Sequence, residues 1–373
     1  MNNPLNNKIN KTITYLSKNK SIDKQWDAFV KQHPEGTIFH LTDYLSCLQS
    51  ESGEELYKIA CVDDSNNIVG IFPLLSTKGF PFKIGGLVGS SRLSSLPRTP
   101  TGGPLASSSR IMINLLDESI KIQNQNPTKT LQIKSFSDNI EIHFKNLYKV
   151  HWRDSYITNL PKDPNSEIKF GDASNHSTIK RCIKKSIKNV LTTRYTEDKK
   201  DLKYWFGLYL DTMKHHVTPA RSLNYFENLW ERLIPQGYMK LIIAEQNNKI
   251  LAGSVLFYFK DTVIYAFNGS DRNYFEFRPN DLLHWTAIED AIKQNYHYYD
   301  LGEVSKNNDG LAKYKKKWGA DIIPIYHYYS PQPDKSEFDS IDEGEASKIK
   351  KKIWNILPLS VTAQIGKWVY SRL

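Results

Sequence analysis

The hydrophobic pattern of this chain changes period several times, and the changes follow a similar order in each half. Apolar residues recur at helical spacing in 24–48, and two runs of β-branched and aromatic residues follow at 56–62 and 68–75, on either side of a polar loop. In the second half, helical segments precede three strand-like runs between 238 and 270, and a helix at 281–295 precedes two further strands. This order predicts an α/β fold with mixed α+β sheets, built as two related units in tandem.

Composition narrows the class of protein. A chain of 373 residues is long enough for two domains with separate cores, and 39% apolar residues exclude wholesale disorder. No apolar run reaches the roughly 20 residues of a membrane-spanning helix. Cys47, Cys61 and Cys182 are widely separated, which argues against a disulfide scaffold or a zinc site, so no metal is expected. The polar N-terminus lacks the features of a signal peptide, and we expect a cytoplasmic protein.

We predict four segments along the chain. Residues 1–20 form a partly ordered N-terminal segment, 21–160 a first domain and 161–330 a second domain. Residues 331–373 form an acidic linker and an amphipathic C-terminal tail. The boundary near 160 rests on the turn-rich stretch PKDPNSE, which follows the strand-like DSYITNL.

Three motifs in the second half occur in a characteristic order. Asn280 precedes a long helix, Asp300-Leu301-Gly302 ends the following strand, and 314–319 read YKKKWG, an aromatic-Lys-x-x-aromatic-Gly pattern. In the first half, TIFHLTDYL, IVGIFPLL and SSLPRTPTGGPL complete the set. With these motifs the chain resembles, over roughly 20–330, the FemAB group of GNAT-like acyltransferases. That group includes the aminoacyltransferases that build peptidoglycan cross-bridges, and relatives that occur with exopolysaccharide genes.

The resemblance implies tandem GNAT-like domains and transfer of an aminoacyl or acetyl group to an amine or hydroxyl of a cell-envelope precursor. It implies no permanently bound cofactor, and the acyl donor is either aminoacyl-tRNA or acyl-CoA. The helical hairpin that some members use for tRNA contact is absent from this sequence. The stretch NGSDRNYFEFRPNDLLHW has one glycine, Gly269, and lacks the glycine-rich turn that holds the pyrophosphate of acetyl-CoA. The donor therefore stays open between the two.

Two residues are the catalytic candidates. The resemblance implies that Lys315 places positive charge beside the oxyanion that develops during acyl transfer. Asp300 stands at the end of a strand, where it could orient Lys315 or accept a proton from the attacking group. Two simpler interpretations stay open: the lysines around 315 could form a solvated run, and Asp300 could cap the turn at Gly302.

Seven further residues are candidates for substrate binding. Arg221 could clamp a phosphate or carboxylate, whereas a lone histidine at a helix end, His216, could equally be a packing residue. Four others lie on or after the third strand of the second half, and one lies in the Gly/Pro-rich loop of the first half. The full set is His216, Arg221, Tyr265, Asn268, Arg278, Asn280 and Arg98.

The net charge of +10 is concentrated in three places. These are the segment 180–194, which could face tRNA or solvent, the motif at 313–317, and the tail at 348–372. In the tail, lysines alternate with apolar residues, which is typical of an interfacial helix on an anionic membrane; packing of the same apolar stripe on the domains is the alternative.

The expected partners are a nucleotide- or lipid-linked envelope precursor, tRNA, and the membrane through the tail. The function expected from the sequence is thus a FemAB-like acyltransferase in the cytoplasm, at the inner face of the membrane. The alternative is a non-catalytic GNAT-like binding protein or scaffold in an envelope-synthesis complex.

Overall fold

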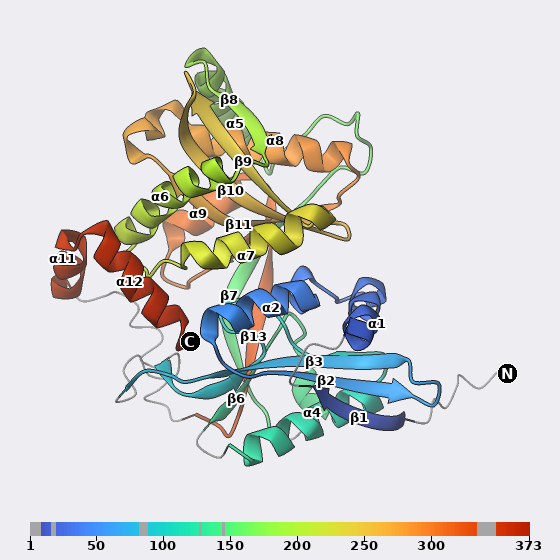
Figure 1. Cartoon of the computed structure of the whole chain (residues 1–373). Coiled ribbons are helices and arrows are strands. Elements are labelled where there is room, and N and C mark those ends of the chain that lie inside the picture. Colours follow the sequence, from blue (N-terminus) through green and yellow to red (C-terminus); the bar gives the residue numbers. More distant parts are fainter. Residues whose placement is uncertain (1–8, 16–19, 82–88, 127–128, 144–145, 334–347) are drawn as a thin grey trace. The chain divides into compact units, whose positions relative to one another are not determined.

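The structure is a computed structural model that describes residues 9–15, 20–81, 89–126, 129–143, 146–333 and 348–373. The chain divides into two compact units. Unit 1 comprises residues 1–152, 325–344 and 370–373, and unit 2 comprises 153–324 and 345–369. Both contain helices and a β-sheet, so the predicted mixed α/β class is confirmed (Figure 1).

Unit 1 is built on strands in the order β1-β2-β3-β4-β6-β13, with β5 beside β3. Helix α4 packs on one face of this sheet, because its apolar stripe, including Ile111 and Leu115, meets Phe72 and Leu131 in a buried core. The elements are β1 (Ile9–Tyr15), α1 (Lys20–Gln32), α2 (Thr42–Ser52), β2 (Leu56–Asp63), β3 (Ile68–Thr77), β4 (Arg92–Ser94), β5 (Leu105–Ala106), α4 (Ser109–Asn124), β6 (Thr130–Ser135) and the first part of β7 (Tyr148–Asn159).

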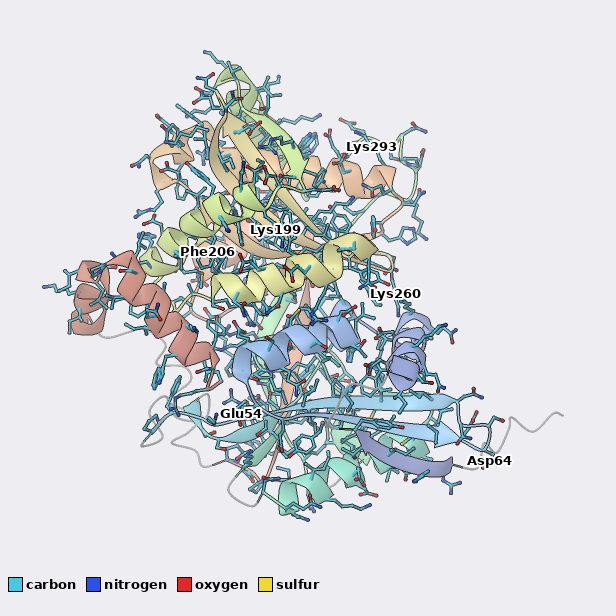
Figure 2. All side chains as sticks on the ribbon, in the orientation of Figure 1. Glu54, Asp64, Lys199, Phe206, Lys260 and Lys293 are labelled. Carbon is cyan, nitrogen blue, oxygen red and sulfur yellow. The ribbon has the colours of Figure 1, made fainter. Side chains whose placement is uncertain are left out.

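Unit 2 has strands in the order β7-β12-β11-β10-β9-β8. Helices α6 and α7 cover one face and α5 and α8 the other (Figure 1). On the first face Trp205 of α6 donates its indole N–H to Gly253 O at 2.8 Å. Figure 2 shows side chains of α6, with Lys199 and Phe206 labelled. The elements are α5 (Ala173–Lys188), β8 (Thr192–Thr196), α6 (Lys199–His215), α7 (Leu223–Leu233), β9 (Met239–Gln246), β10 (Lys249–Phe259), β11 (Thr262–Ser270), α8 (Pro279–Lys293), β12 (Tyr298–Val304), α9 (Asp309–Lys317), β13 (Ala320–Ser330), α11 (Lys348–Ile356) and α12 (Leu359–Tyr370).

The two units repeat one topology. Each contains an edge strand, two helices and an antiparallel ladder of three strands in this order, and a helix then crosses to a strand that runs parallel to the third. In unit 2, β7 and α5 precede the edge strand β8. The parallel pairs are β4–β6 in unit 1 and β11–β12 in unit 2. In each unit a strand from the other half of the sequence completes the sheet: residues 325–330 of β13 pair with β6, and residues 154–159 of β7 pair with β12.

This exchange corrects the predicted division into contiguous ranges. Unit 1 ends its first segment at Trp152 rather than near 160, and it takes up residues 325–344 and 370–373 again. A strand-like stretch such as 148–159 carries no sign in its own sequence of which sheet it will join, because strand pairing depends on partners far away in the chain.

Three short strands lie in stretches with weak hydrophobic patterns. Residues 9–15, within the segment expected to be partly ordered, form β1 and pair antiparallel with β2. The stretch 192–196 is strand β8, paired with β9, and residues 92–94 form the short strand β4. Pairing with neighbouring strands stabilises all three despite their weak patterns.

Candidate active site

Strands β11 and β12 pair only at their beginnings. Their parallel register runs from Thr262 opposite Tyr298 to Ile264 opposite Asp300. Beyond this point β11 continues to Ser270 and β12 to Val304 without further pairing between them. In open α/β sheets, ligands bind outside the carboxyl ends of parallel strands where neighbouring strands part. The predicted residues Tyr265, Asn268 and Asp300 therefore lie at or just beyond the point of divergence.

The two catalytic candidates lie together beside β12, in which Asp300 is the third residue, so the strand continues to Val304 rather than ending at Asp300 as expected. The side chain of Lys315, on α9, is buried, and its Nζ donates hydrogen bonds to Gly302 O at 2.9 Å and Glu303 O at 3.0 Å. Asp300 accepts from the Gly302 N–H at 2.7 Å and from Ser155 Oγ at 3.2 Å. The Gly302 peptide thus contacts both candidates, and the expectation that Asp300 supports the Gly302 turn agrees with this geometry.

Gly302 is required by its backbone. Its φ is +79°, in the left-handed region that favours glycine, and a Cβ there would lie 3.8 Å from Lys315 Nζ. A side chain at this position would therefore strain the turn, although its Cβ would meet Lys315 Nζ only at an ordinary contact distance.

Burial shifts the pKa of both groups. Desolvation lowers the pKa of Lys315 to about 8, opposed by the negative charges of Asp300 and Glu303. Desolvation raises the pKa of Asp300, opposed by the Gly302 N–H and by Lys315. Glu303 also pairs with Arg153 at 2.8 Å. Near neutral pH Lys315 is thus mostly cationic, but it loses its proton far more readily than an exposed lysine.

Three side chains beside the start of α8 form a second polar group. Asn280 Oδ1 accepts from Asn268 Nδ2 at 3.1 Å and from Ser270 Oγ at 2.7 Å. Asn268 Nδ2 also donates to Ser254 Oγ at 3.1 Å. The structure therefore brings the predicted Asn268 and Asn280 together. Ser254 and Ser270 escaped the sequence reasoning, although a serine within the apolar run of β10 is a signal that could have identified the first.

Tyr265 contacts another residue that the sequence reasoning missed. Its ring lies 4.3 Å, centroid to centroid, from that of His284 on α8, and His284 Nδ1 is 3.0 Å from Tyr299 OH. Burial, with smaller contributions from Lys317 and Lys315, lowers the pKa of His284 to about 3. His284 is therefore neutral, and with Tyr265 it forms a packed aromatic layer on the α8 face of the sheet.

The N-terminus of α8 already holds a carboxylate. Asp281, in the first turn, is buried and accepts from Lys317 Nζ at 2.7 Å. Pro279 at the first helical position has no backbone N–H to offer. Arg278, which precedes it with φ of +61°, is exposed. A helix N-terminus attracts anions, but here Asp281 supplies negative charge within the protein.

The other candidates lie apart from this group. Arg221 is buried with its guanidinium 4.2 Å above the ring of Tyr225, on the face that α6 and α7 cover. His216 ends α6 and is exposed; partial desolvation and the positive charges of His215 and Arg272 lower its pKa. Arg98 belongs to unit 1, is exposed, and lies 5.6 Å from the ring of Tyr370. Unit 2 therefore does not assemble the predicted residues into one cluster.

Two surface hollows of unit 2 lie elsewhere. One of about 250 Å³ is lined by Thr262 and Tyr298, the first residues of β11 and β12. The other, of about 300 Å³, is lined by Trp285 on α8 and by Lys293, which Figure 2 labels near the end of that helix. Neither hollow includes a catalytic candidate.

Comparisons with known proteins bear on this site. Residues 173–316 match the family described as "Acetyltransferase (GNAT) domain", and the match includes Asp300 and Lys315. The Lipid II:glycine glycyltransferase of Staphylococcus saprophyticus subsp. saprophyticus is 20% identical over 385 residues, which cover 82% of this chain and 90% of that protein.

Two solved structures have a similar fold. The crystal structure of FemX is 18% identical with a TM-score of 0.66, over 86% of this chain and 98% of that one. A tandem GNAT protein from the clavulanic acid biosynthesis pathway is 10% identical with a TM-score of 0.51, over 87% of this chain and 99% of that one. The repeated topology of the two units agrees with this tandem architecture.

Proposed function

We propose that the chain is a FemAB-like acyltransferase of the GNAT superfamily, which transfers an aminoacyl group to an amine of a lipid-linked peptidoglycan precursor. The observation that carries the proposal is the buried Lys315 beside Asp300, at the point where β11 and β12 part within the GNAT domain. The relative named for glycine transfer to lipid II supports this choice of acceptor.

The proposed reaction replaces an ester bond by an amide bond. The acceptor amine attacks the ester carbonyl of the donor, a C–N bond forms, and the C–O bond to the donor ribose breaks. The amine loses a proton and the departing hydroxyl gains one. Lys315 has three N–H donors and uses two on Gly302 O and Glu303 O, so the third is available to the oxyanion.

Asp300 acts on this centre through its neighbours. Its carboxylate fixes the Gly302 peptide and raises the pKa of Lys315, which keeps more of the lysine in the cationic form. Asp300 is thus a positioning residue in this proposal, and Ser155, which donates to it, supports the same geometry. The acceptor amine then needs another route for its proton, such as bulk water.

For the donor, the structure favours aminoacyl-tRNA over acyl-CoA. The carboxylate of Asp281 and the missing N–H of Pro279 make the start of α8 a poor site for a pyrophosphate. On α5, Lys184, Lys185 and Lys188 are exposed, and the described residues include no acidic partner for them. Such a set of cations suits the phosphates of a nucleic acid.

The scaffold alternative is not favoured. The family match over 173–316, which includes Asp300 and Lys315, and the relative named for glycine transfer support an enzyme instead. A lipid-linked acceptor also implies that the enzyme works at the cytoplasmic face of the membrane, and the C-terminal tail is the segment that we expect to contact it. The described residues include no helix long and apolar enough to cross a bilayer.

The proposal is tested by a transfer assay with the purified full chain. We expect mass spectrometry to find a lipid-linked precursor heavier by one amino-acid residue after incubation with a mixture of aminoacyl-tRNAs. Acetyl-CoA in place of tRNA should give no product. Product from acetyl-CoA alone would overturn the choice of donor, and no product from either donor would overturn the enzymatic function.

A further inference from the structure

The last 27 residues of the chain have one sign of charge. From 347 to 373 there is no aspartate or glutamate. The structure places this stretch in two helices, α11 and α12, which a short turn at Leu357 and Pro358 connects. The cationic residues are Lys348, Lys350, Lys351, Lys352, Lys367 and Arg372.

One side of these helices is fastened to unit 2. Trp354 on α11 donates its indole N–H to Lys214 O at the end of α6, at 3.0 Å. On α12, a Cβ at Gly366 would lie 2.1 Å from Ala220 O, so the helix backbone touches the segment before α7 directly. Thr362 and Val369 are buried on the same side. The tail is therefore a docked element of unit 2, and part of its apolar surface packs as the alternative interpretation expected.

The other side carries large apolar side chains in solvent. Ile353 is 53% exposed and Ile356, three residues on, is 80% exposed. On α12 the spacing of Val361 and Trp368 is also helical, and they are 39% and 47% exposed. The side chain of Lys352, between these apolar groups in sequence, is exposed as well. Exposed apolar groups of this size gathered on one short element mark an interaction site.

We propose that this outer side of α11 and α12 docks on a lipid surface that contains anionic headgroups, with the helices lying in the interfacial plane. The inference rests on the proposed function in one respect, because a lipid-linked acceptor is presented at such a surface. Charge complementarity selects the partner: a tail sequence with six cationic residues and no aspartate or glutamate attracts anionic lipids, and isoleucine and tryptophan enter the headgroup boundary. RNA phosphates would be attracted by the lysines, but they offer no partner for Ile353 and Ile356.

Binding to vesicles tests the proposal directly. The full chain should sediment with vesicles of 30% phosphatidylglycerol in phosphatidylcholine, and at least tenfold less with phosphatidylcholine alone. The double variant Ile353→Glu, Ile356→Glu should bind the anionic vesicles at least tenfold more weakly. A matched control is Lys200→Gln, Lys203→Gln on α6, two exposed lysines whose removal changes the net charge by the same −2; it should bind as the unaltered chain does.

The outcomes are compared after a melting experiment has shown that both double variants are as stable as the unaltered chain. Equal loss in the tail variant and the control would reduce the effect to overall charge and overturn the proposal. Unchanged binding in the tail variant would overturn it too. So would a tail variant that loses tRNA affinity but keeps vesicle binding, because the tail would then be a nucleic-acid surface.

A transfer assay separates this proposal from the proposed function. The tail variant should modify a soluble nucleotide-linked precursor at the normal rate, and a lipid-linked precursor in anionic vesicles at least fivefold more slowly. If the unaltered chain binds vesicles through the tail but transfers nothing, docking stands and the enzymatic function fails. If it transfers to lipid-linked acceptor without binding vesicles, docking fails and the function stands.

Discussion

Units 1 and 2 share a topology but end their parallel strand pairs differently. In unit 1, Ser94 is the last residue of β4 and is still paired with Gln132 of β6. In unit 2, pairing stops at Ile264 although β11 continues to Ser270. In unit 1, β6 also continues beyond its last pair, but by only three residues, 133–135, whereas β11 continues by six, 265–270. A strand that continues beyond its partner exposes backbone and side chains there. The longer continuation lies in unit 2, where we propose the reaction site.

The buried polar groups differ in the same way. In unit 1, Gln132 links Ser94 Oγ at 2.8 Å to Tyr329 OH at 3.1 Å, and His327 Nδ1 lies 3.1 Å from the same hydroxyl. A buried lysine, Lys134, donates to the carbonyl oxygens of Leu96 and Thr99. These groups bond one another and the loop after β4.

Lys315 in unit 2 makes the same kind of contact, with two main-chain carbonyls, but carboxylates lie nearby. The comparison distinguishes Lys134, which binds a loop, from Lys315, which we expect to stabilise a transition state. It predicts that removing Lys315 lowers kcat strongly, whereas removing Lys134 lowers stability with a much smaller effect on kcat.

The largest expected effect is on catalysis by Lys315. Replacement by alanine should lower kcat by roughly 10²–10³, the range seen when one oxyanion donor is lost. The melting temperature should also fall, because Gly302 O and Glu303 O lose their donor, so kcat is measured at a temperature at which the variant is folded. The neighbouring Lys316→Ala, which removes an exposed lysine from the same helix, is the control and should keep full activity. Equal rates for the two variants would disprove the catalytic role.

A second prediction concerns the pH dependence of transfer. Because the pKa of Lys315 is about 8 rather than its ordinary 10.5, and because the cation is the active form, kcat should fall as the pH rises through 8. Asp300 raises that pKa, so Asp300→Asn should move the fall to lower pH by about one unit. Single-turnover rates between pH 6 and 9.5 measure both. A profile that the substitution leaves unmoved would exclude a charge interaction between these residues.

A third prediction concerns the stability of unit 1. Lys134→Met should lower the free energy of unfolding by about 2–3 kcal/mol, since two buried carbonyl oxygens lose their donor. Denaturant titration measures this, with kcat of the folded variant falling less than fivefold. If Lys134→Met instead lost activity as Lys315→Ala does, while remaining folded, the functional distinction between the two lysines would not hold.

How far the sequence predicted these features depends on the range of the interactions. Helical and strand periods predicted most elements, and ordered motifs identified Lys315 and Asp300 as a pair before any contact was known. Those motifs also underlie the resemblance to the FemAB group, with which the GNAT match over 173–316 and the similarity to the glycyltransferase agree. All of these signals lie within short stretches of chain, where spacing alone is informative.

The features that escaped prediction depend on distant partners. Ser155 donates to Asp300 from 145 residues away in sequence, and Gln132 and His327 meet across 195. The exchange of β7 and β13 between the units has the same origin. No local pattern distinguishes Ser155 from any other serine in a strand, because its role is set by pairing with β12.

The smallest expected effect is at Arg98, the predicted binding residue of unit 1. Its side chain is exposed and lies over the ring of Tyr370, an interaction of the kind worth about 0.5–1 kcal/mol at exposed sites. We therefore expect Arg98→Ala to change kcat less than twofold and to lower the melting temperature by only a few degrees. The sharper measurement is KM for the acceptor. If KM rose tenfold at constant kcat, Arg98 of unit 1 would bind the acceptor. The proposal that unit 2 alone provides the site would then be wrong, because unit 1 would bind substrate while unit 2 carries out the reaction.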